Sequence, residues 1–238
     1  MKISIHTSLT VFLVVSLAHE AGARSASSRV GGAEQTAALS YPTDIYPESR
    51  NRLPLIKREN LDELGKTLFD KTAADVRSGR SLAGFQGPNG ITLYSPRLAE
   101  SDQRKNDYLR FDSHLGRRFY ELAILVTARE LDQQFEWTAH EPAALRAGVE
   151  AAVIDVVKYR RPLAGLQPKD AAIIQLGREL VGLRSAQSST LAAALRLFGP
   201  RDLVDAVSVI GHYSAIAVLL NAFDQQLAPG QKPLLPAR

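Results

Sequence analysis

The chain has 238 residues, of which 45% are hydrophobic, enough for one domain of ordinary size with a real core. The formal net charge is +4, but acidic and basic residues are mixed along the chain and no basic stripe with interleaved aromatic residues appears, which argues against nucleic acid as a partner. The chain contains no cysteine, so disulfides and dithiol chemistry are excluded, while the cellular compartment stays open.

The first 23 residues have the pattern of a secretory signal peptide. Lys2 precedes an apolar run of about ten residues, and Ala21-Gly22-Ala23 then forms a small-residue cleavage motif. The apolar run is too short to span a bilayer. We therefore predict cleavage after Ala23 and a periplasmic or secreted protein without membrane contact. A cytoplasmic protein is the alternative if this segment is not used as a signal.

The rest of the chain divides into three parts by composition. Residues 24–50 are rich in Ser, Gly and Ala and lack periodicity, which predicts a flexible leader or an arm that wraps a partner subunit. Residues 51–228 carry apolar residues at helical spacing and form the predicted folded domain. Residues 229–238 contain two prolines after Gly230 and should form an extended tail.

The predicted domain is all-α. Apolar periodicity and capping residues predict helices over residues 61–76, 96–111, 115–140 with a short continuation to Gly148, 151–159, 168–183, 191–198 and 202–227. Between the first two helices, residues 87–90 read Gly-Pro-Asn-Gly, which is turn chemistry, and Ser95-Pro96 has the pattern of a helix N-cap. No alternating pattern typical of a β-strand lasts more than a few residues.

Polar residues are grouped in the predicted helix over residues 115–140. At about 100° per residue, Gln133, Glu136 and His140 fall within roughly 60° of one another, with Arg129 among them. Glu121 begins the same stripe three turns earlier, somewhat to one side. A solvated helix face stabilised by an i, i+4 Glu–His pair is the alternative interpretation. A histidine that titrates near neutrality beside a carboxylate favours a functional site.

The stretch from residue 121 to residue 148 resembles the core motif of the carboxymuconolactone decarboxylase and alkylhydroperoxidase superfamily. In the peroxidase branch this motif is a Glu, then C-x-x-C, then a His four residues after the second Cys, then a Gly. This chain has Glu121, His140 and Gly148 at the matching positions, while Gln133 and Glu136 occupy the two Cys positions. The dithiol peroxidase reaction is therefore impossible here.

The form FEWTAH followed by Pro142 is similar to a cysteine-free, decarboxylase-like subgroup of the same superfamily. The resemblance covers roughly residues 50 to 227. It implies a helical, cofactor-free enzyme that assembles as a homotrimer or a homohexamer. Its implied substrate is a small organic acid or lactone, and its implied reaction is that of a lyase.

Three residues are the catalytic candidates. His140 is predicted to act as general acid or base, or as an oxyanion donor. Glu136, one helical turn earlier, could orient the imidazole or shuttle its proton. Glu121 is the acid carried over from the family motif, and an apolar pocket should raise its pKa, which suits proton relay at neutral pH.

Five further residues are candidates for substrate binding. Arg129 could hold an acidic substrate, or it could pair with Glu121 or Asp132 at the surface, and Gln133 lies on the same stripe. His212 and Tyr213 interrupt an apolar helix, so a buried polar tip there needs a partner; a satisfied core histidine is the alternative. Asn89 belongs to a Gly-Pro-rich segment that the resemblance places beside the pocket, although a plain interhelical connection would explain it equally well.

The sequence predicts neither a metal nor a cofactor. A metal site needs three or four convergent ligands, and no H-x-x-x-H or H-E-x-x-H pattern is present. Two other functions use the same side chains: an isomerase or cyclase that transfers a proton without releasing CO2, and an oligomeric protein that binds a small acid without turnover.

Overall fold

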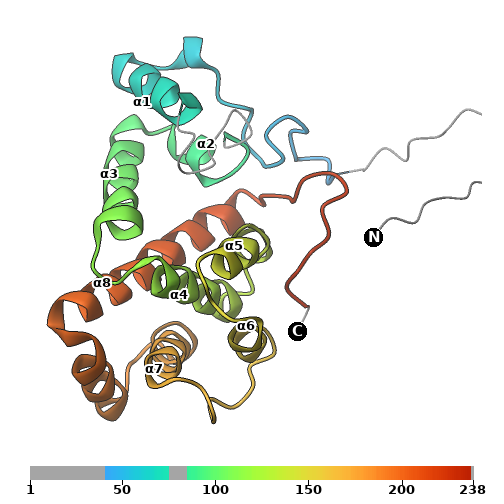
Figure 1. Ribbon diagram of the computed structural model, residues 1–238. Coiled ribbons are helices and arrows are strands. Elements are labelled where there is room, and N and C mark those ends of the chain that lie inside the picture. The colour runs from blue at the N-terminus through green and yellow to red at the C-terminus, as the bar shows by residue number, and fades with distance from the viewer. Residues whose placement is uncertain (1–40, 75–84, 237–238) are drawn as a thin grey trace, which may run out of the picture. The chain divides into compact units, whose positions relative to one another are not determined.

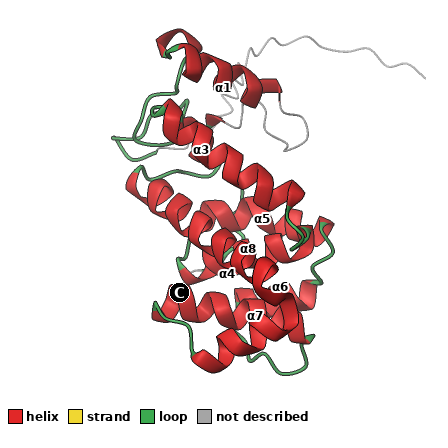
Figure 2. Cartoon of the chain, turned by 90° about the vertical axis from the view of Figure 1, so that its left-hand side faces the viewer, coloured by secondary structure: helices red, strands yellow, loops and turns green. Residues whose placement is uncertain are grey.

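The computed structural model describes residues 41–74 and 85–236. The predicted signal peptide and most of the predicted leader lie outside these residues. The described chain is helical, as predicted, and the one β-pairing within it is an isolated bridge between Tyr46 and Asn51 (Figure 2). Its α-helices are α1 (Glu63–Ala74), α2 (Pro88–Thr92), α3 (Pro96–Asp107), α4 (Arg117–Glu130), α5 (Gln134–Arg146), α6 (Ala151–Lys158), α7 (Pro168–Gly177) and α8 (Ser188–Ala222).

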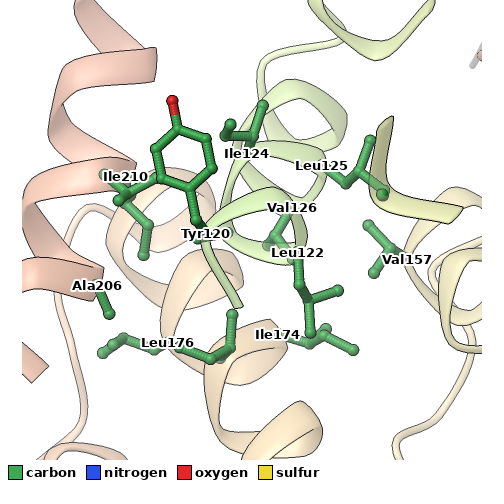
Figure 3. Close-up of a cluster of buried hydrophobic side chains, with 14 of the residues drawn as sticks. Tyr120, Leu122, Ile124, Leu125, Val126, Val157, Ile174, Leu176, Ala206 and Ile210 are labelled. Carbon is green, nitrogen blue, oxygen red and sulfur yellow. The ribbon is translucent and has the colours of Figure 1, made fainter. Parts of the chain in front are cut away.

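Helix α4 lies at the centre of these helices and packs against α5, α6, α7 and α8 (Figure 1). Every residue from Tyr120 to Arg129 is buried, because the helix has neighbours on all sides. Its apolar side chains interlock with those of the surrounding helices, among them Val157 of α6, Ile174 of α7 and Ile210 of α8 (Figure 3). The backbones of α4 and α7 come so close that a Cβ at Gly177 would overlap the side chain of Val126.

A second, smaller apolar cluster forms where α1, α2 and α3 meet. Leu68 of α1, Leu93 after α2 and Ala99 of α3 are buried in it, and the ring of Phe69 stacks on that of Phe85 with centroids 4.3 Å apart. The predicted turn at residues 87–90 is the start of the short helix α2. Ser95 is the N-cap residue of α3, and Pro96 is its first residue, as the sequence predicts.

The predicted single helix over residues 115–140 is wrong. The chain reverses between α4 and α5, where Asp132 adopts the left-handed conformation with φ of 49°. The main-chain N–H of Gln133 donates to the carbonyl of Ala128 (2.8 Å), which closes α4 in a Schellman-like turn. Because neither Gly nor Pro marks this turn, periodicity alone runs the two helices together. Asp is one of the few non-glycine residues that adopt this conformation readily. Helix α5 does end before Gly148, whose φ is +87°.

Helix α8 is divided by Gly199, whose φ of 73° separates two helical halves, as the Gly199-Pro200 pair predicts. It is also the one helix in the described chain that is long and apolar enough to cross a membrane by length and composition. Its most apolar window has a mean hydropathy of 1.8, and 56% of that window is buried within the fold. This is the pattern of a core helix.

Both ends of the described chain pack on the helices. The fold includes residues 41–50, which we expected in the flexible leader: Ile45, Ser49 and Arg50 are buried. Together with Asn51 and Arg52 they form a hairpin-like turn whose main chain is bonded to the residues that follow α8, with the N–H of Arg52 donating to the carbonyl of Phe223 (2.9 Å). The part of the tail that the structure describes has no regular secondary structure, and its Leu235 is buried in the core.

Candidate functional site

A cavity of about 470 Å³ lies between α2, α3, α5 and α8, and the segments before α1 and after α8 complete its wall. Polar and charged side chains make up much of the lining, together with a few apolar ones. The side chains on which the site depends are Arg50, Asn89, Asn106, Arg110, Glu136, His140, Arg146, His212 and Tyr213. The volume of this cavity is suitable for a small-molecule ligand.

His140 is held between two carboxylates at this cavity. Its Nδ1 lies 2.8 Å from Oε2 of Glu121, and its Nε2 lies 3.3 Å from Oε2 of Glu136. Glu136 precedes His140 by one turn of α5, so this contact follows from helical spacing. Glu121 reaches His140 from α4, across the interface of two consecutive helices. The imidazole side chain is 13% exposed, so it borders the cavity from a largely buried position.

Glu121 is fully buried and does not line the cavity. Its Oε1 lies 2.6 Å from Nη2 of Arg117 in an i, i+4 ion pair, although no hydrogen bond reaches that oxygen. Burial would raise the pKa of Glu121, but the charge and hydrogen bond of His140, with Arg117 and Arg110, lower it. Our expectation of a raised pKa is therefore wrong, because the pocket around this carboxyl is cationic rather than apolar.

The same ion pairs keep His140 protonated at neutral pH. Burial acts to lower the pKa of the imidazole, but the charge and hydrogen bond of Glu121, supported by Glu136, raise it to about 9. In the protonated form both ring nitrogens are donors. Nδ1–H therefore donates to Glu121, and Nε2–H points toward Glu136 at the cavity wall.

A second hydrogen-bonded chain runs from the cavity into the core. The hydroxyl of Tyr120 donates to Oδ1 of Asn106 (2.7 Å) and lies 2.8 Å from the hydroxyl of Tyr213. Since Tyr120 donates its only proton to Asn106, the Tyr213 hydroxyl donates to Tyr120. Burial raises the pKa of Tyr120 to about 12 and that of Tyr213 well above its usual value, so both stay neutral. Tyr213 also packs edge-on against His140, with ring centroids 5.2 Å apart.

Three arginines line the cavity, and their charge exceeds that of the acids there. Arg50, Arg110 and Arg146 share the lining with two acids, Glu136 and Asp102, while the charge of His140 is balanced by Glu121 behind it. Arg50 is buried and Arg146 is exposed. The lining therefore favours an anionic ligand by charge.

The structure brings five of the predicted residues together at this cavity: Glu136, His140, His212, Tyr213 and Asn89. Asn89 lies at the start of α2, where a Cβ at Gly90 would overlap the carbonyl oxygen of Phe85, so the tight turn requires glycine. His212 is buried in α8, and its ring packs edge-on against Tyr213.

Arg129 and Gln133 do not line the cavity, which contradicts their predicted role in substrate binding. Arg129 donates through Nη1 to the carbonyl of Pro236 (3.1 Å) and lies 3.4 Å from Oδ1 of Asp132, so it ties the tail to α4. The side chain of Gln133 accepts from the N–H of Phe135 (3.0 Å), which caps α5, and donates to Asn221 (2.6 Å). The turn at Asp132 leaves Arg129 on α4 and makes Gln133 the N-cap residue of α5, so the two residues do not share a helix face with Glu136 and His140.

The cationic part of the site was not predicted from the sequence. Arg117 precedes Glu121 by four residues, a spacing that could have revealed their ion pair. Arg110 and Arg146 carry no comparable signal. Arg50 sits in a segment without periodicity, and only its tertiary contacts bring it to the cavity.

This arrangement can hold an anion and move a proton beside it. In the described part of the chain no three His, Asp or Glu side chains are grouped so as to hold a metal ion. The His140–Glu136 contact places a proton between a donor and an acceptor at the cavity wall, and the arginines can stabilise negative charge that develops on a ligand. No protein-family model matches the chain, and no curated protein matches it either.

Proposed function

We propose that the protein is a cofactor-free enzyme that transfers a proton to or from a small organic acid or lactone in this cavity. The observation that carries the proposal is the position of His140, whose two ring nitrogens contact buried Glu121 and cavity-lining Glu136. Glu121 fixes the ring and keeps it charged, so Nε2–H is available as a general acid at neutral pH. The Glu136 carboxylate beside it can act as the base.

The resemblance to the carboxymuconolactone decarboxylase-like group suggests decarboxylation as the net reaction. Loss of CO2 from an unsaturated lactone acid leaves a dienolate, whose negative charge must be stabilised until a carbon is protonated. The protonated His140 and the cavity arginines supply positive charge, and the His140–Glu136 pair supplies the proton. An isomerase or cyclase would use the same groups without releasing CO2.

The test is designed to detect proton transfer before the substrate is known. A panel of small carboxylic acids and lactones is incubated with the protein in D2O, and proton NMR follows exchange of carbon-bound hydrogen while released CO2 is measured separately. We expect exchange or CO2 release with at least one compound. Glu136→Gln and His140→Gln should each lower the rate by about 10²–10⁴-fold.

The double variant separates a catalytic unit from two independent contributions. If the two side chains act in one proton transfer, removing both should cost little more than removing either. Glu141→Gln is the matched control, because Glu141 lies on the same helix but pairs with Lys158 (2.7 Å) and is not part of the cavity wall. Full activity in folded His140→Gln would exclude His140 from the proton transfer, whereas no exchange and no CO2 release with any compound would favour a protein that only binds its ligand.

We also propose that the protein forms a homo-oligomer, a trimer or a hexamer. The part of α8 after Gly199 exposes Val204, Val207, Gly211, Ala215 and Val218 at spacings of three or four residues, which is the pattern of one helix face. Such a face suits packing against a second copy. Sedimentation velocity at micromolar concentration should give an oligomeric mass, and Val207→Glu with Val218→Glu should reduce it. A monomeric wild-type protein would contradict this proposal.

A further inference from the structure

Arg50 is a buried cation without a carboxylate partner. The residue is 8% exposed, and within residues 41–74 and 85–236 no Asp or Glu forms an ion pair with it. Its Nε is buried and has no hydrogen-bond partner, while Nη2 donates to the side-chain oxygen of Gln86 (3.0 Å). Burying an unpaired charge is unfavourable, so a guanidinium in this position calls for an anion.

The surrounding residues hold Arg50 in place. Its φ of 60° is the left-handed conformation, unusual for arginine, and its carbonyl accepts from the N–H of Gln226 (2.8 Å) and from Nε2 of Gln225 (3.1 Å). Gln86 is oriented in turn, because its Nε2 donates to the carbonyl of Glu48 (2.7 Å) and leaves its oxygen toward Arg50. In Figure 1 this hairpin lies beside α2 and the C-terminal end of α8. Backbone strain maintained by such contacts is common at ligand sites.

We propose that Arg50 binds the carboxylate of the ligand that occupies the His140 cavity. Arg50 and His140 line the same cavity, and a planar guanidinium that has no ion-pair partner among the described residues matches the two oxygens of a carboxylate. Burial lowers the pKa of Arg50, and an incoming carboxylate would relieve that unfavourable environment. The inference deepens the proposed function by assigning the residue that anchors the acid, while binding itself requires no turnover.

Isothermal titration calorimetry with three probes tests this assignment on the full chain. Benzoate carries a carboxylate on a ring that can contact apolar lining residues such as Phe135 and Ile216, benzamide is its neutral counterpart, and inorganic phosphate is a different anion. We expect saturable binding of benzoate that is tighter than binding of either benzamide or phosphate. In a ¹⁵N-edited NMR spectrum, the Nε–H resonance of Arg50 should shift on addition of benzoate.

Two variants remove the anchor in different ways. Arg50→Gln removes the charge and should weaken benzoate binding by about 10-fold or more, because a hydrogen-bonded ion pair is lost. Gln86→Glu leaves Arg50 in place but gives it an internal carboxylate partner, so it should also weaken benzoate binding. Arg52→Gln is the matched control: it removes one positive charge from the same hairpin at an exposed position that does not line the cavity, and should change affinity by less than about 3-fold.

Equal benzoate affinity in folded Arg50→Gln and wild type would overturn the inference, as would wild-type protein that binds no benzoate or prefers phosphate. If Arg50→Gln does not fold, Gln86→Glu and the Arg50 resonance decide the question. Binding that depends on Arg50, together with full activity in His140→Gln, would uphold this inference and reject the proposed proton transfer. If proton transfer depends on His140 but benzoate affinity does not depend on Arg50, the proposed proton transfer is supported and the role of Arg50 is rejected.

Discussion

Two adjacent arginines at the start of α4 each pair with a buried carboxylate, and the two pairs differ in what surrounds them. Arg117 pairs with Glu121, which also holds His140 beside the cavity. Arg118 forms a two-pronged ion pair with Asp170 of α7, contacts Glu150 and donates to the carbonyl of Gly148 (3.0 Å). Asp170 is buried and does not line the cavity, and within the described residues the one ion-pair partner it has is Arg118, whose proton does not leave near neutral pH.

The comparison shows that burial of a paired carboxylate does not by itself indicate function. Asp170 is bonded to a guanidinium that stays charged at every physiological pH, so the pair fixes α4 against α7. Glu121 is bonded to an imidazole whose proton can leave, and that imidazole borders a space large enough for a ligand. A titratable partner and access to the cavity distinguish the candidate site from the structural pair.

The largest expected difference between the two pairs is in activity. In the D2O exchange assay, Glu121→Gln should lower the rate by about 10²-fold or more, because His140 loses the charge that orients it and keeps it protonated. Asp170→Asn should leave the rate per folded molecule within about 2-fold. NMR titration of His140 provides a second measurement: its pKa should fall from about 9 toward 6.5 in Glu121→Gln and should not move in Asp170→Asn. Equal losses of activity in Glu121→Gln and Asp170→Asn would mean that the Glu121 pair has no functional role that the Asp170 pair lacks.

The next difference is in stability. Asp170→Ala leaves Arg118 without its buried partner, so we expect a loss of about 2–4 kcal/mol in the free energy of unfolding, measured by urea denaturation. Arg118 is partly exposed, which holds the loss to the lower part of the range. Glu150→Ala is the control on the same arginine: Glu150 is 64% exposed, so its removal should change stability much less than Asp170→Ala does. A loss of similar size in both variants would mean that Asp170 has no special structural role.

The sequence predicts that Glu121, Glu136 and His140 lie together, but it places all three on a single helix, which is wrong. Glu121 and His140 were expected on one continuous helix, and they meet instead across the turn at Asp132. Their contact follows from the antiparallel packing of α4 and α5, whereas Glu136 and His140 are neighbours by helical spacing, which periodicity does reveal. The all-α class follows from apolar periodicity, which needs no tertiary information.

Arg129 and Arg50 show where sequence reasoning ends. Arg129 shares the helical phase of the candidate residues, yet the break at Asp132 directs it to the C-terminal tail. Arg50 lies in a stretch without pattern, and it reaches the cavity through hydrogen bonds to residues more than 30 and more than 170 positions away. Contacts at such sequence separation leave no local signal, so a single sequence cannot reveal them.

The smallest expected effect is a difference in how pH changes the stability of the two pairs. The pKa of His140 is raised to about 9 in the folded protein from 6.5. The folded state therefore binds the proton more tightly, and the resulting stabilisation is fully present below about pH 6.5 and is lost as pH rises toward 9. A shift of this size corresponds to at most about 3 kcal/mol, and to less if the cavity is hydrated. Arg118 does not titrate in this range.

Urea denaturation at pH 6 and pH 9.5 measures that difference directly. His140→Gln should be destabilised relative to wild type at pH 6, and the gap should shrink by about 1–3 kcal/mol at pH 9.5, where wild-type His140 is also neutral. For Asp170→Ala the gap to wild type should be the same at both pH values, because the guanidinium of Arg118 stays charged at both. A gap for His140→Gln that does not depend on pH would mean that folding does not raise the pKa of His140, so that the imidazole is mostly neutral above pH 7. Glu136 would then have to be the proton donor as well as the acceptor.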